Sequence, residues 1–254
     1  MIPIPEIDLP KMRRSCHTAA KILQYVGSHV RPGISTNELD RICEEYTVSL
    51  GATSACLGYH GYPKSVCISV NDCVCHGLPD DYVLQEGDIA NIDVTCIVEG
   101  YYGDTSGMFT VGEVSSEALR LIDVAEKAMY KGIEAIGPGA TTGDIGFAIN
   151  KFVTKNGYTA VRDIGGHGIG RFFHGDPFVP SYGKKGKGTR LVPGTCITVE
   201  PMVNETDADV VESGIENSSI KIYHTADKCL SAQFEHTILI TEEGCEILTV
   251  FEGE

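Results

Sequence analysis

The apolar pattern of the first half of the chain predicts a hairpin of two buried strands. Apolar residues dominate 88–98, and a second apolar segment follows at 102–111. The turn "EGYYG" between them contains two glycines, which suits a tight β-hairpin. Asp93 lies in the middle of the first strand, between Ile92 and Val94. A buried carboxylate without a partner costs several kcal/mol or takes up a proton. The position of Asp93 therefore requires a neutralising partner.

Two segments before this hairpin carry helical patterns. Residues 11–30 place their apolar side chains on one stripe, at Ala19, Ile22, Leu23, Val26 and Val30. In "RPGISTNELDRICEEYTVSLG", Thr36 is the predicted N-cap, Glu38 and Asp40 lie near the helix start, and Gly51 ends the segment. A helix pair is therefore expected before the first strands.

The chain repeats this arrangement. Residues 116–136 are again helical, and "PGATTGDIG" (138–146) matches "PGISTNELD" (32–40) at an offset of 106. "EGDIANID" places Asp93 six residues after Gly87, and "PGTCITVE" places Glu200 six residues after Gly194. "HGLPD" (76–80) and "HGDP" (174–177) also correspond. "YGDTSGMFTVG", with Asp104, and "FEHTILIT", with Glu235, are a fourth pair, and four matches in the same order indicate a duplicated unit.

The repeat predicts the fold class. We expect an α/β (α+β) protein of one domain, residues 1–254, with an internal repeat over approximately 11–115 and 116–250. Each half would contribute two helices and an antiparallel sheet, and an approximate two-fold axis would relate the halves. Two unrelated α+β stretches are the alternative.

Four acidic residues occupy matched positions in the two halves. Asp93 lies within a strand, Asp104 at the head of an apolar strand, and Glu200 and Glu235 at the corresponding places of the second half. Taken singly, each acid is more typical of a strand edge or turn. Four buried carboxylates that meet would repel one another, and protons or divalent cations would neutralise them. Oxygen ligands with one imidazole suit Mn, Fe or Co, and a bridging carboxylate favours a metal pair.

Three histidines extend this set. His167 and His174 lie in the glycine-rich "IGGHGIGRFFHGDP", for which an irregular backbone is predicted, and His76 is the first-half counterpart of His174. His167 is the predicted ligand, and His174 and His76 are expected nearby. His236 follows Glu235 and should point to the opposite face of its strand. The sequence leaves His60 undecided, and it predicts surface positions for His17, His29 and His224.

Composition excludes some classes of function. The net charge is −15, so nucleic acid is not expected as the main partner. No basic segment followed by an apolar run begins the chain, and no window is apolar enough for a membrane span. Ten cysteines without a C-x-x-C motif are expected to be buried thiols in a reducing cytoplasm rather than a zinc site.

Five motifs together resemble those of type I methionine aminopeptidases, of the pita-bread fold. They are "GYHGYPKSVCISVNDCVCHGLPDD", "NIDVTCIVEGYYGDTSGMF", "GGHGIGRFFHGDP", "ITVEPMV" and "LSAQFEHTILIT". The resemblance covers essentially the whole chain. It is closest to the bacterial type, which lacks an N-terminal zinc-binding extension.

The resemblance implies a ligand set and a mechanism. Two divalent ions (Co, Mn, Fe, Zn or Ni) would be held by five residues, with Asp104 and Glu235 bridging: Asp93, Asp104, His167, Glu200 and Glu235. Glu200 would be the acid/base that assists water attack on the first peptide bond. His174 would bind the oxyanion, and His76 would contact the scissile amide nitrogen.

The same resemblance implies further binding residues. The methionine pocket would be formed by Cys56, Tyr59, Tyr62, Cys67 and Phe173, whose side chains could equally be ordinary core. A monovalent cation would lie near Asn71, Cys73 and Ser231. The expected substrate is the N-terminal methionine of polypeptides, with the ribosome as a further partner, no membrane, and a cytoplasmic monomer.

The sequence departs from the family pattern in one place. Family members usually carry a tryptophan at the rim of the methionine pocket, but this chain has none. The corresponding position falls near Lys221, with Tyr223 close by, in a segment (203–230) that is longer than usual and should form a different lid. Prolidases carry a large preceding domain and type II enzymes an inserted helical segment. A non-catalytic binding module of the same fold is the alternative outside enzymes.

Overall fold

The computed structural model describes residues 2–250, and its helices follow the repeat. They are α1 (Leu9–Gly27), α2 (Thr36–Ser49), α3 (Ser116–Glu134) and α4 (Thr142–Lys155), with short 3-10 turns η1 (Glu6–Asp8) and η2 (Tyr59–Gly61). The first helix of each half has 19 residues and the second has 14. No helix in this range is long and apolar enough to cross a membrane.

The predicted helix N-cap was wrong by one residue. Ser35, and not Thr36, caps α2, because its hydroxyl accepts the Glu38 backbone N–H at 3.1 Å. In the second half Thr141 occupies the same place and forms a reciprocal capping box with Asp144. Gly51 follows the end of α2 with a φ of +72°, as expected of a residue that stops a helix.

The strands pair antiparallel throughout the described residues. In the first half they are β1 (Thr53–Ser54), β2 (Cys67–Val70), β3 (Cys73–Cys75), β4 (Ile89–Val98) and β5 (Tyr101–Thr110). In the second half they are β6 (Thr159–Ala160), β7 (Gly166–Ile169), β8 (Gly175–Val179), β9 (Cys196–Val199), β10 (Met202–Asn204), β11 (Val210–Gly214), β12 (Lys221–Thr225), β13 (Ser231–Gln233), β14 (His236–Ile240) and β15 (Cys245–Ile247).

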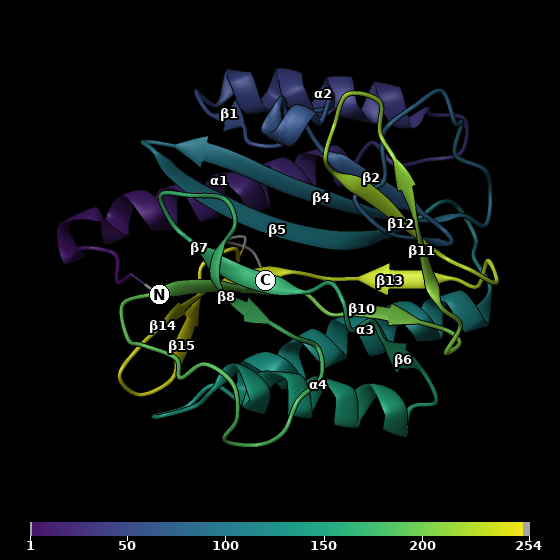
Figure 1. Cartoon of the computed structure of the whole chain (residues 1–254). Coiled ribbons are helices and arrows are strands. Elements are labelled where there is room, and N and C mark those ends of the chain that lie inside the picture. The colour runs from purple at the N-terminus through teal and green to yellow at the C-terminus, as the bar shows by residue number, and fades with distance from the viewer. Residues whose placement is uncertain (1, 251–254) are drawn as a thin grey trace.

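These strands form a layer between the two helix pairs. One sheet has the order β1-β4-β2 with β5 beside β4, and another has the order β15-β14-β9-β7-β8. Two three-stranded sheets, β13-β10-β6 and β11-β12-β3, complete the layer, and the second joins a first-half strand to the β11–β12 hairpin. Figure 1 shows α1 and α2 on one side of the strands and α3 and α4 on the other. This is the architecture that the repeat predicts.

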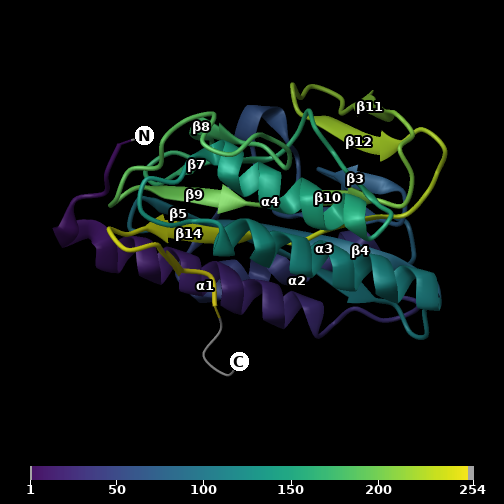
Figure 2. The same cartoon turned by 90° about the horizontal axis from the view of Figure 1, so that it is seen from below.

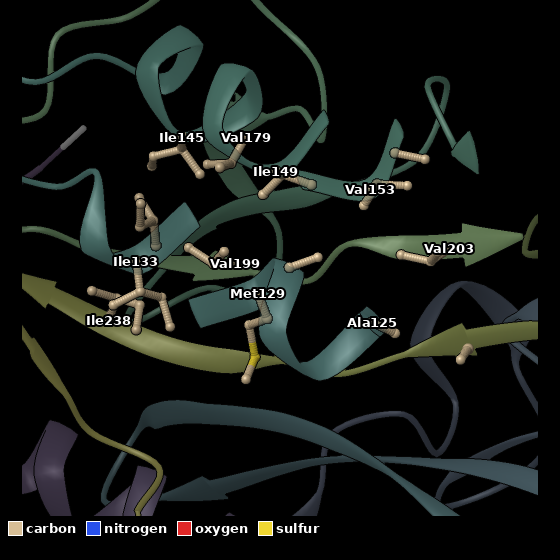
Figure 3. Packing of buried hydrophobic residues seen from close by; sticks show 14 of the residues in the cluster. Ala125, Met129, Ile133, Ile145, Ile149, Val153, Val179, Val199, Val203 and Ile238 are labelled. Atoms are coloured by element: carbon tan, nitrogen blue, oxygen red, sulfur yellow. The ribbon is translucent and has the colours of Figure 1, made fainter. Parts of the chain in front are cut away.

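The two helix pairs bury separate apolar clusters against their own strands. Figure 3 shows the cluster of the second half, in which Met129 of α3 and Ile149 of α4 face Val199 and Ile238 of the sheet. A second cluster packs Ile22 of α1 and Leu39 of α2 against Ile92 of β4. Figure 2, seen from below, shows α3 and α4 side by side in front of the strands. Both faces of the strand layer are therefore covered by helices.

All ten cysteines are free thiols, as expected. Eight are buried, and Cys229 and Cys245 are partly exposed.

Candidate metal centre and active site

The β4–β5 hairpin positions the two acids of the first half. Its turn consists of Glu99 and Gly100, both with positive φ (52° and 78°), which is the geometry of a two-residue hairpin. The register pairs Asp104 with Thr95, two residues from Asp93, so all three side chains lie on one face. Asp104 is therefore in the middle of β5, not at its head. The Thr95 hydroxyl donates to Asp104 Oδ1 at 2.7 Å.

The acids of the second half lie where strands are interrupted. Glu200 follows the last residue of β9, and Glu235 lies between β13 and β14. The prediction that Glu200 lies within a strand was thus wrong. Glu235 precedes an apolar strand, as predicted. Glu235 joins the halves, because its N–H donates to the Ser106 carbonyl at 3.1 Å and its own carbonyl accepts the Thr105 hydroxyl at 2.8 Å.

His167 reaches the acids from strand β7, where an irregular segment was predicted. The register of β7 shifts between Gly166 and Gly168, so His167 lies in a bulge. A Cβ at Gly166 or Gly168 would lie 2.2 Å from a backbone oxygen of a neighbouring strand. Glycine is thus required for the strands to approach closely here.

These residues converge on one centre. Ligand atoms of Asp104, His167 and Glu235 all lie within 4.8 Å of one another. His167 Nε2 lies 3.6 Å from Asp104 Oδ2 and 3.6 Å from Glu200 Oε1. Asp93 lines the same cavity, which has a volume of about 230 Å³. The structure therefore brings together all five predicted ligands, from both halves of the chain.

Burial and mutual repulsion make the charged forms of these carboxylates unfavourable when no cation is bound. Burial, followed by the charge of Asp104, raises the pKa of Asp93 well above its usual value, and the same causes raise that of Glu235. Burial also raises the pKa of Glu200. Burial by itself would lower the pKa of His167, but the neighbouring carboxylates of Asp104 and Glu200 outweigh it and raise the pKa. Among the described residues, no lysine or arginine lines this cavity to balance these acids.

A divalent cation fits this deficit. Among the described residues, Glu235 Oε1 is one of a few buried side-chain oxygens without a hydrogen-bond partner. The 3.6 Å separations at His167 exceed hydrogen-bond length, and they suit atoms that share a cation. Hard carboxylate oxygens with one imidazole form a donor set that transition metals accept. The residues present thus fit a metal centre.

The two further histidines line the same cavity. His76, held at a positive φ of 56°, has its Nδ1 3.1 Å from the Lys221 carbonyl of β12. His174 has its Nδ1 2.9 Å from the Tyr59 hydroxyl, and its ring lies 4.3 Å from that of His167. Burial lowers the pKa of His76, and it lowers that of His174 to about 4. Both imidazoles are therefore neutral at neutral pH.

An apolar wall adjoins the acids. All five residues predicted for the methionine pocket line the cavity: Cys56, Tyr59, Tyr62, Cys67 and Phe173. They pack in one cluster against which Ile220 and Ile222 also lie. Ile220, and not the predicted neighbour Lys221, contributes to the cavity from the segment before β12. Tyr223 packs on His76, with ring centroids 5.9 Å apart.

Three residues that hold the acids were not predicted from the sequence. Thr95 donates to Asp104, as described, and Thr198 donates to Glu200 Oε1 at 2.7 Å while accepting the His167 N–H at 3.0 Å. Gln233 donates to Glu200 Oε2 at 3.2 Å. Each lies two residues from a predicted ligand along the chain, and the two-residue period of strands is the signal that identifies them.

The remaining histidines do not line this cavity. His236 points to the opposite side, as predicted, where its Nδ1 lies 2.8 Å from the Thr249 hydroxyl. His60 is exposed, and its carbonyl accepts from the Ser218 hydroxyl at 3.0 Å. His224 lies 3.3 Å from Asp72.

Known proteins share this sequence and fold. A sequence model described as metallopeptidase family M24 matches residues 10–242. Methionine aminopeptidase of Rickettsia prowazekii is 48% identical over 245 residues, which are 96% of this chain and 93% of that protein. Methionine aminopeptidase of Escherichia coli strain K12 is 48% identical over 251 residues, which are 98% and 93% of the two chains.

Solved structures agree. The crystal structure of the Rickettsia prowazekii methionine aminopeptidase superposes with a TM-score of 0.95 at 47% identity, covering 98% of this chain and all (100%) of that one. The prolidase of Pyrococcus horikoshii shares the fold at a TM-score of 0.77 and 22% identity, but this chain covers only 65% of it. The rest of that prolidase chain has no counterpart in this one. The chain belongs to the methionine aminopeptidases of metallopeptidase family M24 and has their pita-bread fold.

Proposed function

We propose that this metallopeptidase removes the N-terminal methionine of polypeptides by means of a pair of divalent ions. The observation that carries the proposal is the convergence of four carboxylates and one imidazole from both halves on a single cavity. Asp93, Asp104, His167, Glu200 and Glu235 would hold the two ions, and the family resemblance assigns Asp104 and Glu235 as the residues that both ions share. The oxygen-rich ligand set suits Mn, Fe or Co, and it also accepts Zn or Ni.

A bound metal pair supplies an activated water and polarises the scissile carbonyl. Glu200 then carries the proton, from the attacking water to the leaving amine. Thr198 and Gln233 each donate to one Glu200 oxygen and so hold the carboxylate in place.

The neutral histidines act on the two ends of the scissile amide. His76 donates its Nδ1–H to the Lys221 carbonyl, since a carbonyl only accepts, and this leaves Nε2 as an acceptor for the amide N–H. His174 donates to the developing oxyanion. The low pKa of His174 keeps it neutral, so it can act as a donor without adding a positive charge beside the metals.

The apolar wall binds the methionine side chain. Tyr62 is 2% exposed, and its hydroxyl donates to the Gly77 carbonyl at 2.9 Å, so its ring forms a fixed face of the slot. Cys56 and Cys67 add polarisable sulfur that suits a thioether. Ile220 replaces an aromatic rim with a smaller aliphatic one.

A monovalent cation near Asn71, Cys73 and Ser231 is part of the same proposal. Support comes from the hydroxyl of Ser231 and Oδ1 of its strand partner Asn204, which are buried without a hydrogen-bond partner among the described residues. Contact with the ribosome, a monomeric state and a cytoplasmic location remain predictions from the resemblance.

The test is metal-dependent release of methionine. Mn²⁺ or Co²⁺ is added to the metal-free chain, and cleavage of Met-Gly-Met is compared with that of N-acetylated Met-Gly-Met. We expect cleavage only with metal and only of the free amine. No release from a folded, metal-treated chain would instead support a non-catalytic binding module.

A further inference from the structure

The hydroxyl of Tyr59 makes a contact that a purely apolar pocket wall does not require. It lies 2.9 Å from Nδ1 of His174. A neutral imidazole carries one N–H and one bare nitrogen, and the partner of one nitrogen decides which tautomer forms. A tyrosine hydroxyl can donate or accept, so it allows Nδ1 to be the bare nitrogen.

His76 has the opposite arrangement. Its Nδ1 faces the carbonyl of Lys221 at 3.1 Å, and a carbonyl can only accept. The proton of His76 is therefore on Nδ1, and its Nε2 accepts. The two histidines of this cavity thus face hydrogen-bond partners of different chemistry. This suits their proposed roles, in which His76 accepts from the amide N–H and His174 donates to the carbonyl oxygen.

The loop that carries Tyr59 is fixed from outside. Gly58 and His60 on either side of it have positive φ values of 82° and 48°. The carbonyl of His60 accepts from the Ser219 N–H at 3.0 Å, in the turn between β11 and β12. A Cβ at Gly61 would lie 2.3 Å from the Asn217 carbonyl oxygen of the same turn. This contact holds the Tyr59 loop against the hairpin that also supplies the carbonyl for His76.

Ring packing completes the alignment. Phe173 stacks on His174 with centroids 4.1 Å apart and an angle of 18°, and Tyr59 packs on Phe173 at 4.8 Å. The imidazole plane is thereby set, and the hydroxyl of Tyr59 meets the edge that carries Nδ1.

We propose that Tyr59 is a positioning residue for His174. Its O–H donates to Nδ1 and keeps the imidazole proton on Nε2, the nitrogen that donates to the carbonyl oxygen of the substrate. The inference rests on the oxyanion role of His174 given under Proposed function. It adds that the β11–β12 hairpin, through Lys221 and through the Tyr59 loop, positions both histidines.

The direct test reads the tautomer. Full-length chain labelled with ¹⁵N-histidine, metal-free and Zn²⁺-loaded, is studied by two-bond ¹H–¹⁵N correlation at about pH 8, roughly 1.5 units above the ordinary histidine pKa. His174→Asn identifies the His174 signals. We expect the Nε2–H tautomer in the wild type and a mixture with Nδ1–H in Tyr59→Phe. Tyr62→Phe is the matched control, because its hydroxyl contacts backbone carbonyls and no histidine, and it should leave the His174 tautomer unchanged.

A kinetic cycle separates positioning from substrate binding. Tyr59→Phe should lower kcat roughly tenfold and change KM by no more than about twofold. This loss is smaller than the roughly 10²–10³-fold loss of kcat that follows removal of an oxyanion donor itself. It should have no further effect in a His174→Asn background. An unchanged tautomer in Tyr59→Phe, or an equal loss of kcat in both backgrounds, would overturn the positioning role of Tyr59 and leave the oxyanion role of His174 intact. Normal turnover of His174→Asn would overturn the oxyanion role and the proposal that depends on it.

Discussion

The two halves of the molecule have the same helices but different strands. Their helices have equal lengths, and the second half repeats the helix starts at offsets of 107 and 106 residues. In the first half, Asp93 and Asp104 lie within two continuous strands of ten residues each. In the second half, Glu200 and Glu235 lie at interruptions between short strands.

This difference distinguishes the features that apolar packing requires from those that the proposed metal centre requires. The helices repeat because each pair covers an apolar strand face of its own half. The strands are free to differ as long as four carboxylates reach one point. A glutamate side chain is one methylene longer than aspartate, and it reaches the centre from an interruption where the backbone leaves the strand.

Both halves also supply a threonine to an acid. Thr95 donates to Asp104 and Thr198 to Glu200, each at 2.7 Å. Thr198 additionally accepts the backbone N–H of His167. In the second half one threonine hydroxyl therefore contacts two predicted ligands, Glu200 and His167. In the first half the corresponding hydroxyl contacts only Asp104.

Asp104→Asn should have the largest effect, because it removes a bridging charge at the seam between the halves. Asparagine keeps the size and the contact with Thr95, so the fold should persist. We expect activity to fall roughly a thousandfold or more, with loss of one of the two metals, because the pair supplies several kcal/mol of transition-state stabilisation. Metal content by elemental analysis and release of methionine measure this. Asp123→Asn, on the exposed face of α3, is the control, and near-normal turnover of Asp104→Asn would refute the bridging assignment.

His76→Ala should have the next largest effect, and it removes a first-half side chain that contacts Lys221 of the second half. Loss of the contact to the scissile amide should lower kcat roughly a hundredfold, as is usual for a positioned polar group at a reacting centre. The metals should still bind, because His76 is not a ligand. Isothermal titration with Mn²⁺ checks the second statement, and a loss of metal would show that the role is misassigned.

Thr95→Val and Thr198→Val compare the halves directly at constant side-chain size. Removal of a hydroxyl that orients a ligand should weaken Mn²⁺ binding by roughly ten- to a hundredfold. We expect the larger loss for Thr198→Val, because it also leaves the His167 N–H without its partner. Dissociation constants from titration decide the order. Equal losses would mean that the second contact of Thr198 contributes nothing.

Asp8 supplies the smallest predicted effect, at a contact between the halves outside the site. Its carboxylate accepts from Lys11, from Arg171 of the second half and from Tyr101 of the first, and these bonds lower its pKa from the usual 3.8 to about 2. Because the folded pKa is the lower one, the stabilisation is complete above pH 3.8 and disappears as the pH falls towards 2. Asp8→Asn should therefore lose less stability than wild type over this interval. Thermal unfolding between these pH values measures it, and parallel curves for the two proteins would contradict the prediction.

The sequence predicted the parts of the fold that local rules determine. Helix periodicity and the glycine-containing β4–β5 turn each have short-range signals, and the structure contains both of them. The cap at Ser35 was missed by one residue because Ser-Thr offers two adjacent capping side chains. The strand at His167 was missed because four nearby glycines favour a loop, unless close strand packing requires them, as it does for Gly166 against Thr198 and Gly168 against Asp176.

The candidate acids could be predicted where both halves of the repeat carry one at a matched position. Asp93 and Glu200 stand at matched positions, so their charges were noticeable in an apolar context. Thr198 and Gln233 lack this doubled signal, and only their two-residue spacing from a predicted ligand identifies them. Ile220 in the cavity could not be predicted either, since the path of the chain before β12 depends on contacts of Asn217 and Ser218 with the Tyr59 loop.

The central claim is that acids from both halves surround one pair of cations. Anomalous scattering from crystals of the chain soaked in Mn²⁺ tests it most directly. The account predicts two adjacent peaks, roughly 3.5–4 Å apart, with Asp104 and Glu235 between them. A single peak bound by residues of one half, or no peak within the cavity, would contradict it.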